Sequence, residues 1–543
     1  MNFKFSQENY VQMKATVEKI KSFLGSKKIL WLILGIIIAV GIFLRTYHFH
    51  DWLRFNMDQG RDAVLISNVV DGSTPIPLIG PKAGGTEFKL GPMPYYFQII
   101  SAKLFGNFPD KMAYPDLISS ILCIPLLFFF LQKYFTGSLS IALTGLFSLS
   151  FYAVLYSRFA WNPNSTPFWT ILGLYGIHNI ISQKNPHKIF WATITGIAIG
   201  VGVQLHTTLL LFFPIITILI FGFLLYQKIN LLKYFFIILV ISLFLNIPQF
   251  INEYKTNGQN IQRFFTGVQM KQDPTKTFID KTLRNTSCWA GSNVVILSGY
   301  ELFNSCQINS ETDFFDITIF ALGVIFLFGG TYLGIRYLKQ EQDLDKKYFL
   351  AIIFLYIGIA YLTYLPLAYS IDMRFFLMFI FFPLILLGFW TKFLMEKIPK
   401  NIAHLSLIPI ILLVASNLFF IKNSFADFAD FEEGRESKNV LSNVMLKEIE
   451  CVSNFIIENS SAEKELYISG NKQYLRKSIN SINFFVSRSN LKLIVFDESK
   501  ETKEDAFYLR SSNKRKQILK ESNTPIRYDT CGRMLIYRSI QQQ

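Results

Sequence analysis

The sequence predicts an all-α polytopic membrane protein with a small α/β domain at its C-terminal end. Three observations lead to this fold class. Of 543 residues, 51% are hydrophobic and only 17% are charged, whereas soluble proteins are typically about one-quarter charged. The apolar residues gather in runs long enough to cross a membrane, and residues 423–543 lose that character. The composition excludes a disordered chain and, with 5 cysteines, a disulfide-rich secreted scaffold.

Eleven apolar runs are candidates for membrane-spanning helices, because a bilayer core of about 30 Å needs about 20 helical residues. The runs are 29–44, 117–131, 140–157, 167–182, 189–206, 208–226, 235–251, 314–335, 348–369, 375–394 and 403–421. The fifth and sixth form one stretch of 38 residues, Ile189–Tyr226, whose helical length is close to two crossings at about 1.5 Å per residue. We therefore expect a tight reversal at Gln204–Thr208.

The distribution of Lys and Arg predicts the orientation of these spans. The N-terminal tail, residues 1–28, and the loops on its side carry a net charge of +12, against +2 for the loops on the other side. Because cytoplasmic loops are enriched in Lys and Arg, we expect a cytoplasmic N-terminus in the plasma (inner) membrane and, with eleven spans, a C-terminus outside. The first 28 residues carry no signal-peptide cleavage pattern, so the first helix is expected to remain as an anchor. The overall charge of +15 thus records membrane orientation and not nucleic-acid binding.

Three segments are then expected outside the membrane: the outer loops 45–113 and 253–313 of a transmembrane domain spanning 29–422, and the tail 423–543. The tail is expected to form an α/β domain. Its short β-type runs are Leu466–Ser469, Phe484–Val486, Leu491–Phe496 and Met534–Tyr537, and a helical stretch covers Val440–Ile457.

The cysteines are consistent with this topology. Cys288 and Cys306 fall in the second outer loop, and Cys451 and Cys531 fall in the tail. Two pairs on the oxidising side of the membrane predict the disulfides Cys288–Cys306 and Cys451–Cys531. Four free thiols are the alternative.

Polar residues gather in the loop that directly follows the first span. Asp58 and Asp62 are four residues apart, so in a helix they share one face, with Arg61 beside them. A carboxylate there could act as a general base on a hydroxyl group, or the pair could hold a divalent cation. The alternative is an interfacial amphipathic helix with solvated charges.

The same loop continues with a stretch rich in glycine and proline, Ile79–Phe97, which predicts a fixed turn. Further polar residues lie at the outer ends of later spans. Together these two sets comprise Glu87, Lys89, Tyr95, Arg158, Asn162, His206, Asp372 and Arg374. A cavity lined by such groups would suit an anionic lipid headgroup and a hydroxyl acceptor. An interhelical role for His206 and a local ion pair for Asp372 and Arg374 remain the alternatives.

The order of these motifs resembles the GT-C glycosyltransferases of the family 39 type, which include the protein O-mannosyltransferases and the aminoarabinose transferase of lipid A. Asp58-Gln59 stands where that family has Asp-Glu, and Lys89–Tyr96 stands where it has Lys-Pro-Pro-x-x-Tyr-Tyr, followed here by Leu104–Gly106. The late element is Arg374-Phe375-Phe376 with Pro383. The resemblance covers roughly residues 29–400. Gln59 in place of an acid and the separated prolines Pro92 and Pro94 depart from the pattern.

The resemblance implies an inverting transfer of a sugar from a polyprenyl-phosphate donor to a hydroxyl acceptor in a protein, lipid or glycan, on the outer face and without a metal or other cofactor. It implies Asp58 as the general base. The residues implied in binding the donor phosphate are Arg61, Lys89, Arg374 and His206. Those implied in binding the acceptor or supporting the site are Asp62, Glu87, Tyr95, Arg158 and Asn162. The expected partners are the lipid-linked sugar and membrane lipids, with no nucleic acid.

A multi-spanning transporter or lipid flippase without chemistry is the alternative function, and a sensor or scaffold is a third. Transporters tend to show internal repeats and broken helices that carry charges in the middle of the bilayer. Here the polar groups gather at the outer helix ends and in loop 45–113. This placement favours chemistry at the membrane surface.

Overall fold

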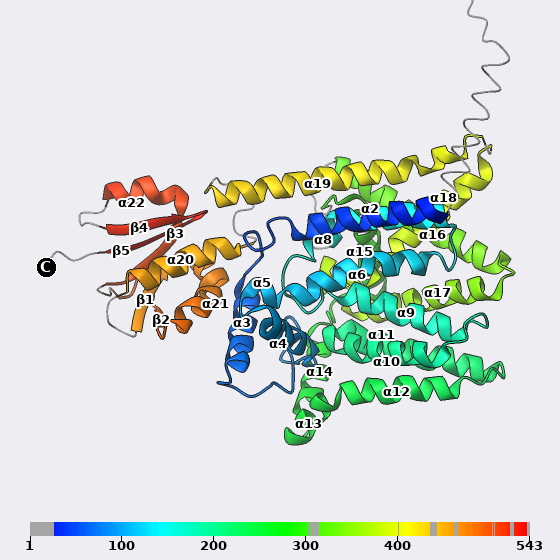
Figure 1. Cartoon of the computed structure of the whole chain (residues 1–543), viewed down its shortest axis with the longest axis horizontal. Coiled ribbons are helices and arrows are strands. Elements are labelled where there is room, and N and C mark those ends of the chain that lie inside the picture. Colours follow the sequence, from blue (N-terminus) through cyan, green and yellow to red (C-terminus); the bar gives the residue numbers. More distant parts are fainter. Residues whose placement is uncertain are drawn as a thin grey trace, which may run out of the picture.

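The computed structural model describes residues 27–301, 306, 314–399, 401–434, 443–460, 465–501, 503, 505–521 and 526–539. The N-terminal tail predicted for 1–28 lies almost wholly outside these residues. The described chain forms a bundle of apolar helices, a group of short helices at one end of it, and a small sheet beyond them (Figure 1). An all-α membrane part followed by a C-terminal α/β domain is the fold class that the sequence predicts.

The bundle contains the runs predicted to be spanning helices, except that the end of run 235–251 lies in a separate short helix, Ile247–Lys255. It also contains the helix Phe278–Ser298, which the sequence analysis places in the outer loop 253–313; Trp289 and Val295 of this helix are buried in the bundle core. Its elements are α2 (Lys27–Thr46), α6 (Tyr114–Leu131), α7 (Gly137–Ser148), α8 (Phe151–Leu155), α9 (Thr166–Ile181), α10 (Lys188–Leu205), α11 (Thr207–Tyr226), α12 (Leu232–Leu245), α15 (Phe278–Ser298), α16 (Phe314–Gln340), α17 (Leu344–Tyr364), η1 (Leu365–Leu367), η2 (Met373–Phe379), α18 (Phe381–Lys397), η3 (Ala403–Leu407) and α19 (Ile408–Glu432). Within the described residues, seven helices are long and apolar enough to cross a membrane, or nine if each bent pair counts as one span. The bent pairs are α12 with α13, at 55°, and η2 with α18, at 63°. The count of eleven is therefore not reached on length and composition, because α7 and α9 have only 12 and 16 residues.

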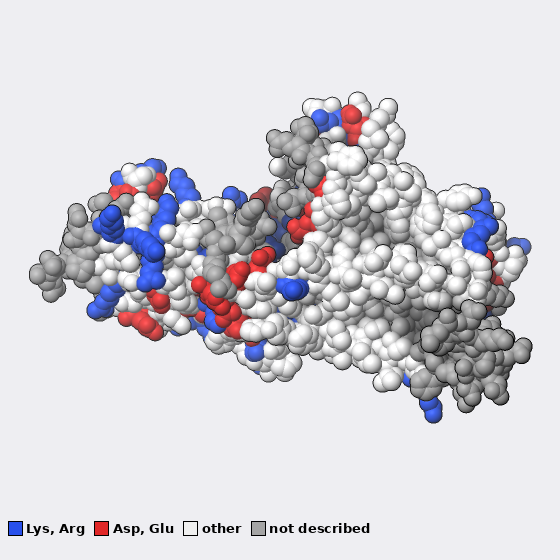
Figure 2. Space-filling model, turned by 90° about the horizontal axis from the view of Figure 1, so that it is seen from above, with Lys and Arg blue, Asp and Glu red and all other residues white. Residues whose placement is uncertain are grey.

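The surface of the bundle confirms a multi-pass membrane protein. Figure 2 shows a broad band of uncharged side chains over the bundle, with Lys, Arg, Asp and Glu gathered toward its ends and on the C-terminal domain. Large apolar side chains of the bundle helices are exposed, such as Leu32 on α2 (63%), Phe328 on α16 (58%) and Leu412 on α19 (64%). Water would penalise such a surface, whereas lipid chains accommodate it.

The predicted reversal between the fifth and sixth runs is confirmed. α10 ends at Leu205, His206 takes an extended conformation (φ −153°, ψ 139°), and α11 begins at Thr207. A single non-helical residue thus breaks the 38-residue run and leaves the His206 side chain at the end of two helices.

Five short helices lie outside the bundle, at the end that faces the sheet (Figure 1). They are α3 (Met57–Val70), α4 (Met93–Phe105), α5 (Pro109–Met112), α13 (Ile247–Lys255) and α14 (Gln259–Met270). α14 is amphipathic: Ile261 and Phe265 are exposed, whereas Asn260 and Gly267 are buried. Apolar side chains exposed at this level suit the boundary between lipid and water.

The C-terminal domain is a five-stranded mixed sheet with strand order β2-β1-β3-β5-β4. Its elements are α20 (Leu446–Glu458), β1 (Glu465–Gly470), α21 (Lys472–Arg488), β2 (Lys492–Val495), β3 (Phe507–Ser511), η4 (Ser512–Lys514), α22 (Arg515–Glu521), β4 (Ile526–Cys531) and β5 (Met534–Ser539). β1 pairs with β2 and β3 in parallel, while β5 pairs with β3 and β4 in antiparallel. The boundary predicted at residue 423 falls inside α19, which continues to Glu432.

Both predicted disulfides are present. Cys451 of α20 is bonded to Cys531 at the end of β4, which ties a helix to the sheet. Cys288 of α15 is bonded to Cys306 in the loop that follows. Both cross-links lie in segments that the sequence places outside the membrane.

The short helices α3 to α5 and the C-terminal domain share one hydrophobic core. Phe55 and Ile66 on the loop side belong to the same buried cluster as Ile449, Phe484 and Phe507. The bundle has a separate and larger core. The C-terminal domain is therefore packed onto the first outer loop and is not held by the bundle core.

A histidine joins the two parts of this junction. His50 lies 3.2 Å from the buried Asp110 of α5 and 3.2 Å from Glu450 of α20. Burial by itself lowers the pKa of His50, but Glu450 and Asp110 outweigh it and raise the pKa above its ordinary value. Asp110 also pairs with Lys111 at 2.9 Å, and Asp51 lies close enough to Glu450 to raise its pKa, after burial as the main cause.

We expect the junction to weaken as pH rises. A group whose pKa is raised by folding stabilises fully below its unfolded pKa, about 6.5 for histidine, and that contribution is lost as pH rises through the folded pKa. Limited proteolysis between α19 and α20 should therefore accelerate between mildly acidic and alkaline pH. His50→Gln should flatten this dependence, while His187→Gln, at an exposed position before α10, should not. An unchanged profile in His50→Gln would contradict the assignment.

Candidate active site

A cavity of about 630 Å³ opens at the end of the bundle that carries the short helices. Its walls come from α3, the turn at 81–90, the loop before α9, the break between α10 and α11, α14 and the start of η2. Its polar and aromatic lining includes Asp58, Arg61, Asp62, Lys82, Glu87, Trp161, Asn162, His206, Arg263, Lys271 and Arg374. Segments far apart in the sequence thus converge on one polar chamber beside apolar helices.

The wall formed by α3 carries the two carboxylates expected from the sequence. Arg61 lies between them, 3.0 Å from Asp58 and 2.9 Å from Asp62, and the Tyr95 hydroxyl donates to Asp62 at 2.9 Å. Burial raises the pKa of Asp62 although Arg61 opposes the shift, and burial together with Asp62 raises the pKa of Tyr95, which stays a donor. Asp62 is thus enclosed, with 16% of its side chain exposed, whereas 50% of Asp58 is exposed. Asp58 is the carboxylate available to a ligand.

Gln59 stands where the family pattern has a second acidic residue, and its side chain bonds to the backbone just before its own helix. Its side-chain oxygen accepts a hydrogen bond from the Asn56 backbone N–H at 3.2 Å, and the residue is buried. Gln59 therefore caps the start of α3 and takes no part in the cavity.

A cationic group stands on the walls provided by η2 and the end of α14. Arg374 pairs with Asp372 at 3.1 Å and lies over the ring of Trp161 at 5.6 Å. Lys271 lies 5.8 Å from the Phe375 ring centre, and within the described residues no carboxylate pairs with it. Burial and Arg374 both lower the pKa of Lys271. The two cations thus repel each other, and an anion between them would remove that cost.

His206 completes this group as a neutral donor. Burial, then Arg374 and Lys271, lower the pKa of His206 to about 3, so the imidazole is uncharged at neutral pH. Its Nδ1 accepts from the Thr208 backbone N–H at 3.2 Å. This hydrogen bond assigns the remaining proton to Nε2, which leaves an N–H donor in the cavity wall.

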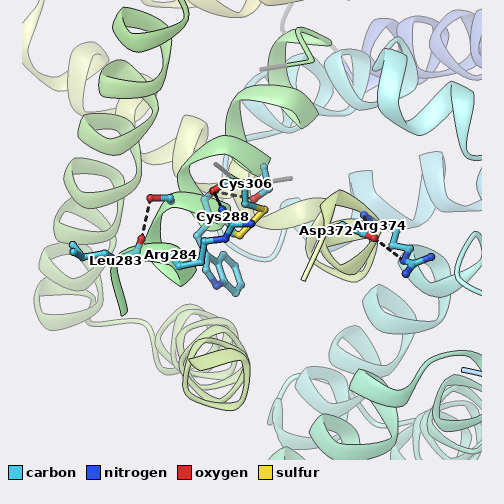
Figure 3. The surroundings of a disulfide bond; sticks show 9 residues. Leu283, Arg284, Cys288, Cys306, Asp372 and Arg374 are labelled. Atoms are coloured by element: carbon cyan, nitrogen blue, oxygen red, sulfur yellow. Dashed lines mark hydrogen bonds and ion pairs between the residues drawn. A yellow bond between two sulfur atoms is a disulfide. The ribbon is translucent and has the colours of Figure 1, made fainter. Parts of the chain in front are cut away.

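The segment that carries Asp372 and Arg374 is anchored next to the first disulfide. α15 packs against η2, and Arg284 of α15 donates to the Cys306 carbonyl at 2.9 Å. In the view of Figure 3, the Arg374 side chain extends away from the disulfide and keeps its contact with Asp372. The Asp372 carboxylate also accepts from the Arg374 backbone N–H at 3.1 Å, which fixes the first turn of η2.

The predicted turn is a short hairpin that lies against the cavity. Backbone bonds join Ala83 to Phe88 at 2.8 Å and Gly80 to Leu90 at 2.7 Å. A Cβ on Gly84 would lie 3.3 Å from an Arg374 terminal nitrogen, so glycine permits the close approach of that side chain. Glu87 pairs with Lys82 at 2.7 Å at the exposed rim.

The structure separates two predicted residues from the cavity. Lys89 does not line it; its backbone N–H and C=O bond to the Asn260 side chain at 2.9 Å each. Arg158 is buried and donates to backbone carbonyls of residues 44–48, so it fixes the chain after α2. The other predicted residues line the cavity or, in the case of Tyr95 and Asp372, bond to a residue that does.

The cavity is also lined by four residues to which no sequence pattern pointed, namely Lys271, Arg263, Lys82 and Trp161. Lys271 and Arg263 lie in a loop with six basic and six acidic residues, where no pattern distinguishes them. Trp161 is adjacent to the predicted Asn162, and its contact with Arg374 depends on packing between distant segments.

An apolar groove of about 60 Å³ continues from the cavity. It shares Lys271, Phe375 and Thr207 with the cavity, and its own wall contains Leu211, Phe212, Phe264, Val268 and Leu367. Lys271 thus lines both the polar cavity and the apolar groove beside it. Such a pair of compartments fits a ligand with a charged head and a hydrocarbon chain.

Comparison with known proteins agrees with this architecture. The family of dolichyl-phosphate-mannose-protein mannosyltransferases matches residues 89–251, and no curated protein matches the chain. The crystal structure of ArnT from Cupriavidus metallidurans bound to undecaprenyl phosphate is similar at 10% identity, covering 95% of this chain and 99% of that one, with a TM-score of 0.55. The oligosaccharyltransferase of Archaeoglobus fulgidus in its apo form matches at 12% identity over 87% of this chain and 65% of that one, with a TM-score of 0.49.

Proposed function

We propose that this chain, a membrane glycosyltransferase of the GT-C fold, transfers a sugar from a polyprenyl-phosphate donor to a hydroxyl acceptor. The observation that carries the proposal is the cavity itself, which places a half-exposed carboxylate, Asp58, and a cationic group on different walls. The family match to dolichyl-phosphate-dependent mannosyltransferases and the similar structure bound to undecaprenyl phosphate support a donor of this kind.

The donor phosphate is assigned to Lys271, Arg374 and the Nε2–H of His206. Two cations and a neutral donor suit a phosphate diester, and they stabilise the negative charge that grows on the leaving phosphate as the glycosidic bond breaks. The apolar groove beside Lys271 receives the first isoprene units of the lipid. Trp161, held under Arg374, offers a flat apolar face to the sugar ring.

Asp58 is assigned as the general base. It accepts the proton of the acceptor hydroxyl while the hydroxyl oxygen attacks the anomeric carbon and the phosphate leaves with its electron pair. Attack from the α3 wall on a donor held by the Lys271 wall approaches opposite to the leaving group, which inverts the anomeric configuration. Arg61 and Tyr95 hold Asp62, so that this second carboxylate supports the site and orients Arg61.

We further propose that the cavity faces outside the cell. The loops at the opposite end of the bundle carry the excess of Lys and Arg, which is typical of the cytoplasmic side. Cys451 and Cys531 belong to the C-terminal domain, at the end of the bundle that carries the short helices (Figure 1), and Cys288 lies on α15, which packs against η2. Disulfides persist in oxidising compartments. A lipid-linked donor suits this location.

The test is product release from purified full-length protein. With a panel of polyprenyl-phosphate sugars and hydroxyl acceptors, free polyprenyl phosphate should appear only when a suitable acceptor is present. Absence of release with every donor, together with movement of the lipid across a vesicle membrane, would contradict the proposal and support a flippase.

A further inference from the structure

The C-terminal domain is joined to the backbone that leads into α3. The Phe55 N–H donates to the Val444 carbonyl at 2.8 Å, and the Leu446 N–H donates to the Leu53 carbonyl at 2.9 Å. Arg54 and Met445 form an antiparallel bridge between these two bonds. The residues just before α3 are therefore fixed as a short strand against the start of the C-terminal domain.

A helix of the same domain then presses on α3 itself. Ser481 of α21 donates to the Phe55 carbonyl at 2.7 Å, and Asn480 donates to the Met57 carbonyl at 3.2 Å. A Cβ on Gly60 would lie 2.4 Å from the Ser481 backbone nitrogen, which is closer than any real Cβ contact. Only glycine at this position lets the two helix backbones meet.

α3 thus lies between the C-terminal domain and the cavity. Gly60 is buried against α21, while Asp58 and Arg61, its near neighbours in the helix, line the cavity. The helices packed against α3 are α21 most extensively, then α4 and α5. The position of the carboxylate wall is therefore set chiefly by the C-terminal domain, whereas the cations assigned to the donor phosphate stand on η2 of the bundle and at the end of α14.

We propose that the C-terminal domain is a positioning element of the transferase site, in which Ser481 and Gly60 set the depth of α3 and hence the distance of Asp58 from the bound donor. The inference rests on the proposed function, since it assigns a purpose to a contact that is otherwise structural. Displacing a base by about 1 Å can reduce a rate by about 100-fold. A small shift of α3 at the contact of Gly60 with Ser481 would therefore lower the rate of transfer.

The test uses two variants and one control in the full-length protein. Gly60→Ala should push α3 away from α21 and reduce kcat by about 10- to 30-fold. Ser481→Ala adds no bulk and removes one hydrogen bond, so it should reduce kcat about threefold. Both should leave the KM for the polyprenyl-phosphate sugar within about twofold, because Lys271, Arg374 and His206 stand on other walls. Gly35→Ala, at an exposed position of α2 with open space around it, should match the wild type.

Hydrogen exchange separates positioning from a general loss of stability. If the inference holds, both variants show faster exchange confined to α3 and the segment before it, with the bundle unchanged. Wild-type kcat in both variants, or a rise in KM with kcat unchanged, would overturn the inference. If Gly60→Ala does not fold, the kcat and the hydrogen exchange of Ser481→Ala alone test the inference. Absence of transfer by the wild type would instead refute the proposed function.

Discussion

Replacing Asp58 by asparagine is expected to reduce the rate of sugar transfer by about 100- to 10,000-fold, which is the contribution typical of a general base. Asparagine keeps the size of the side chain and can still bond to Arg61, which lies 3.0 Å from the carboxylate in the wild type. It cannot accept the proton of the acceptor hydroxyl. The measurement is the initial rate of polyprenyl phosphate release at saturating donor.

The control for this variant is Asp71→Asn at the other end of the same helix. Asp71 accepts from Ser67 and Asn107 at 3.2 and 3.1 Å and does not line the cavity, so the rate should stay within about twofold of the wild type. Because general-base catalysis affects the chemical step, Asp58→Asn should retain donor binding. Full activity in Asp58→Asn would remove this residue from the role of base.

Arg374→Ala is expected to be the second most damaging change. The guanidinium is one of two cations assigned to the donor phosphate, and a hydrogen bond to a charged group contributes about 1.5–3 kcal/mol, which corresponds to roughly 10- to 150-fold in kcat/KM. The loss should appear in both donor affinity and kcat, because the phosphate gains negative charge as it leaves. Arg374→Lys should recover only part of the activity, since lysine lacks the planar group that lies over Trp161.

Lys89→Ala is the informative comparison for this prediction. The sequence resemblance implies Lys89 in donor binding, whereas its backbone is held by Asn260 and its side chain does not line the cavity. We therefore expect donor affinity in Lys89→Ala to stay within about twofold. A loss equal to that of Arg374→Ala would mean that the donor binds outside the cavity described.

The sequence was sufficient for most helices of the bundle, because long apolar runs dominate their energetics. It also located the reversal at His206, because the apolar run there is long enough for two crossings. It located both cysteine pairs, because each pair falls in one segment on the same side of the membrane. It missed α15, which lies in an outer loop, 253–313, expected to contain no span, because polar residues such as Asn285, Ser292 and Asn293 interrupt the apolar character of this helix. It did not yield a firm number of spans. α7 and α9 are short, and α12 and η2 bend at their junctions with the next helix, so an apolar run does not correspond to one straight crossing.

The C-terminal domain was predicted less completely. Phe484–Val486 was expected to be a strand and lies in α21, where Leu475, Ser478 and Ile482 form one buried face of an amphipathic helix. β3 and β4 were missed. In β4 the central residues Arg527, Tyr528 and Asp529 are exposed, so this edge strand lacks the apolar alternation that identifies buried strands.

The site was predicted where local spacing determines geometry and missed where tertiary packing does. Asp58, Arg61 and Asp62 meet because they share one helical face. Lys271 comes near Arg374 only through tertiary contacts, such as that of Lys271 with the Phe375 ring and that of Gly267 with Thr86 of the hairpin, which no local pattern encodes. The contact of Gly60 with Ser481 links residues more than 400 positions apart and was equally invisible.

That separation has a consequence for how the enzyme is made. Asn56 receives its bond from the Val444 N–H, 388 residues later in the chain, so the ribosome has completed nearly the whole bundle before the partner of this segment exists. Contacts of such long range form late in folding. If the C-terminal domain positions α3 as proposed, the carboxylate wall reaches its final position only at the end of biosynthesis, and we expect a chain truncated before this domain to contain the bundle without a correctly placed Asp58.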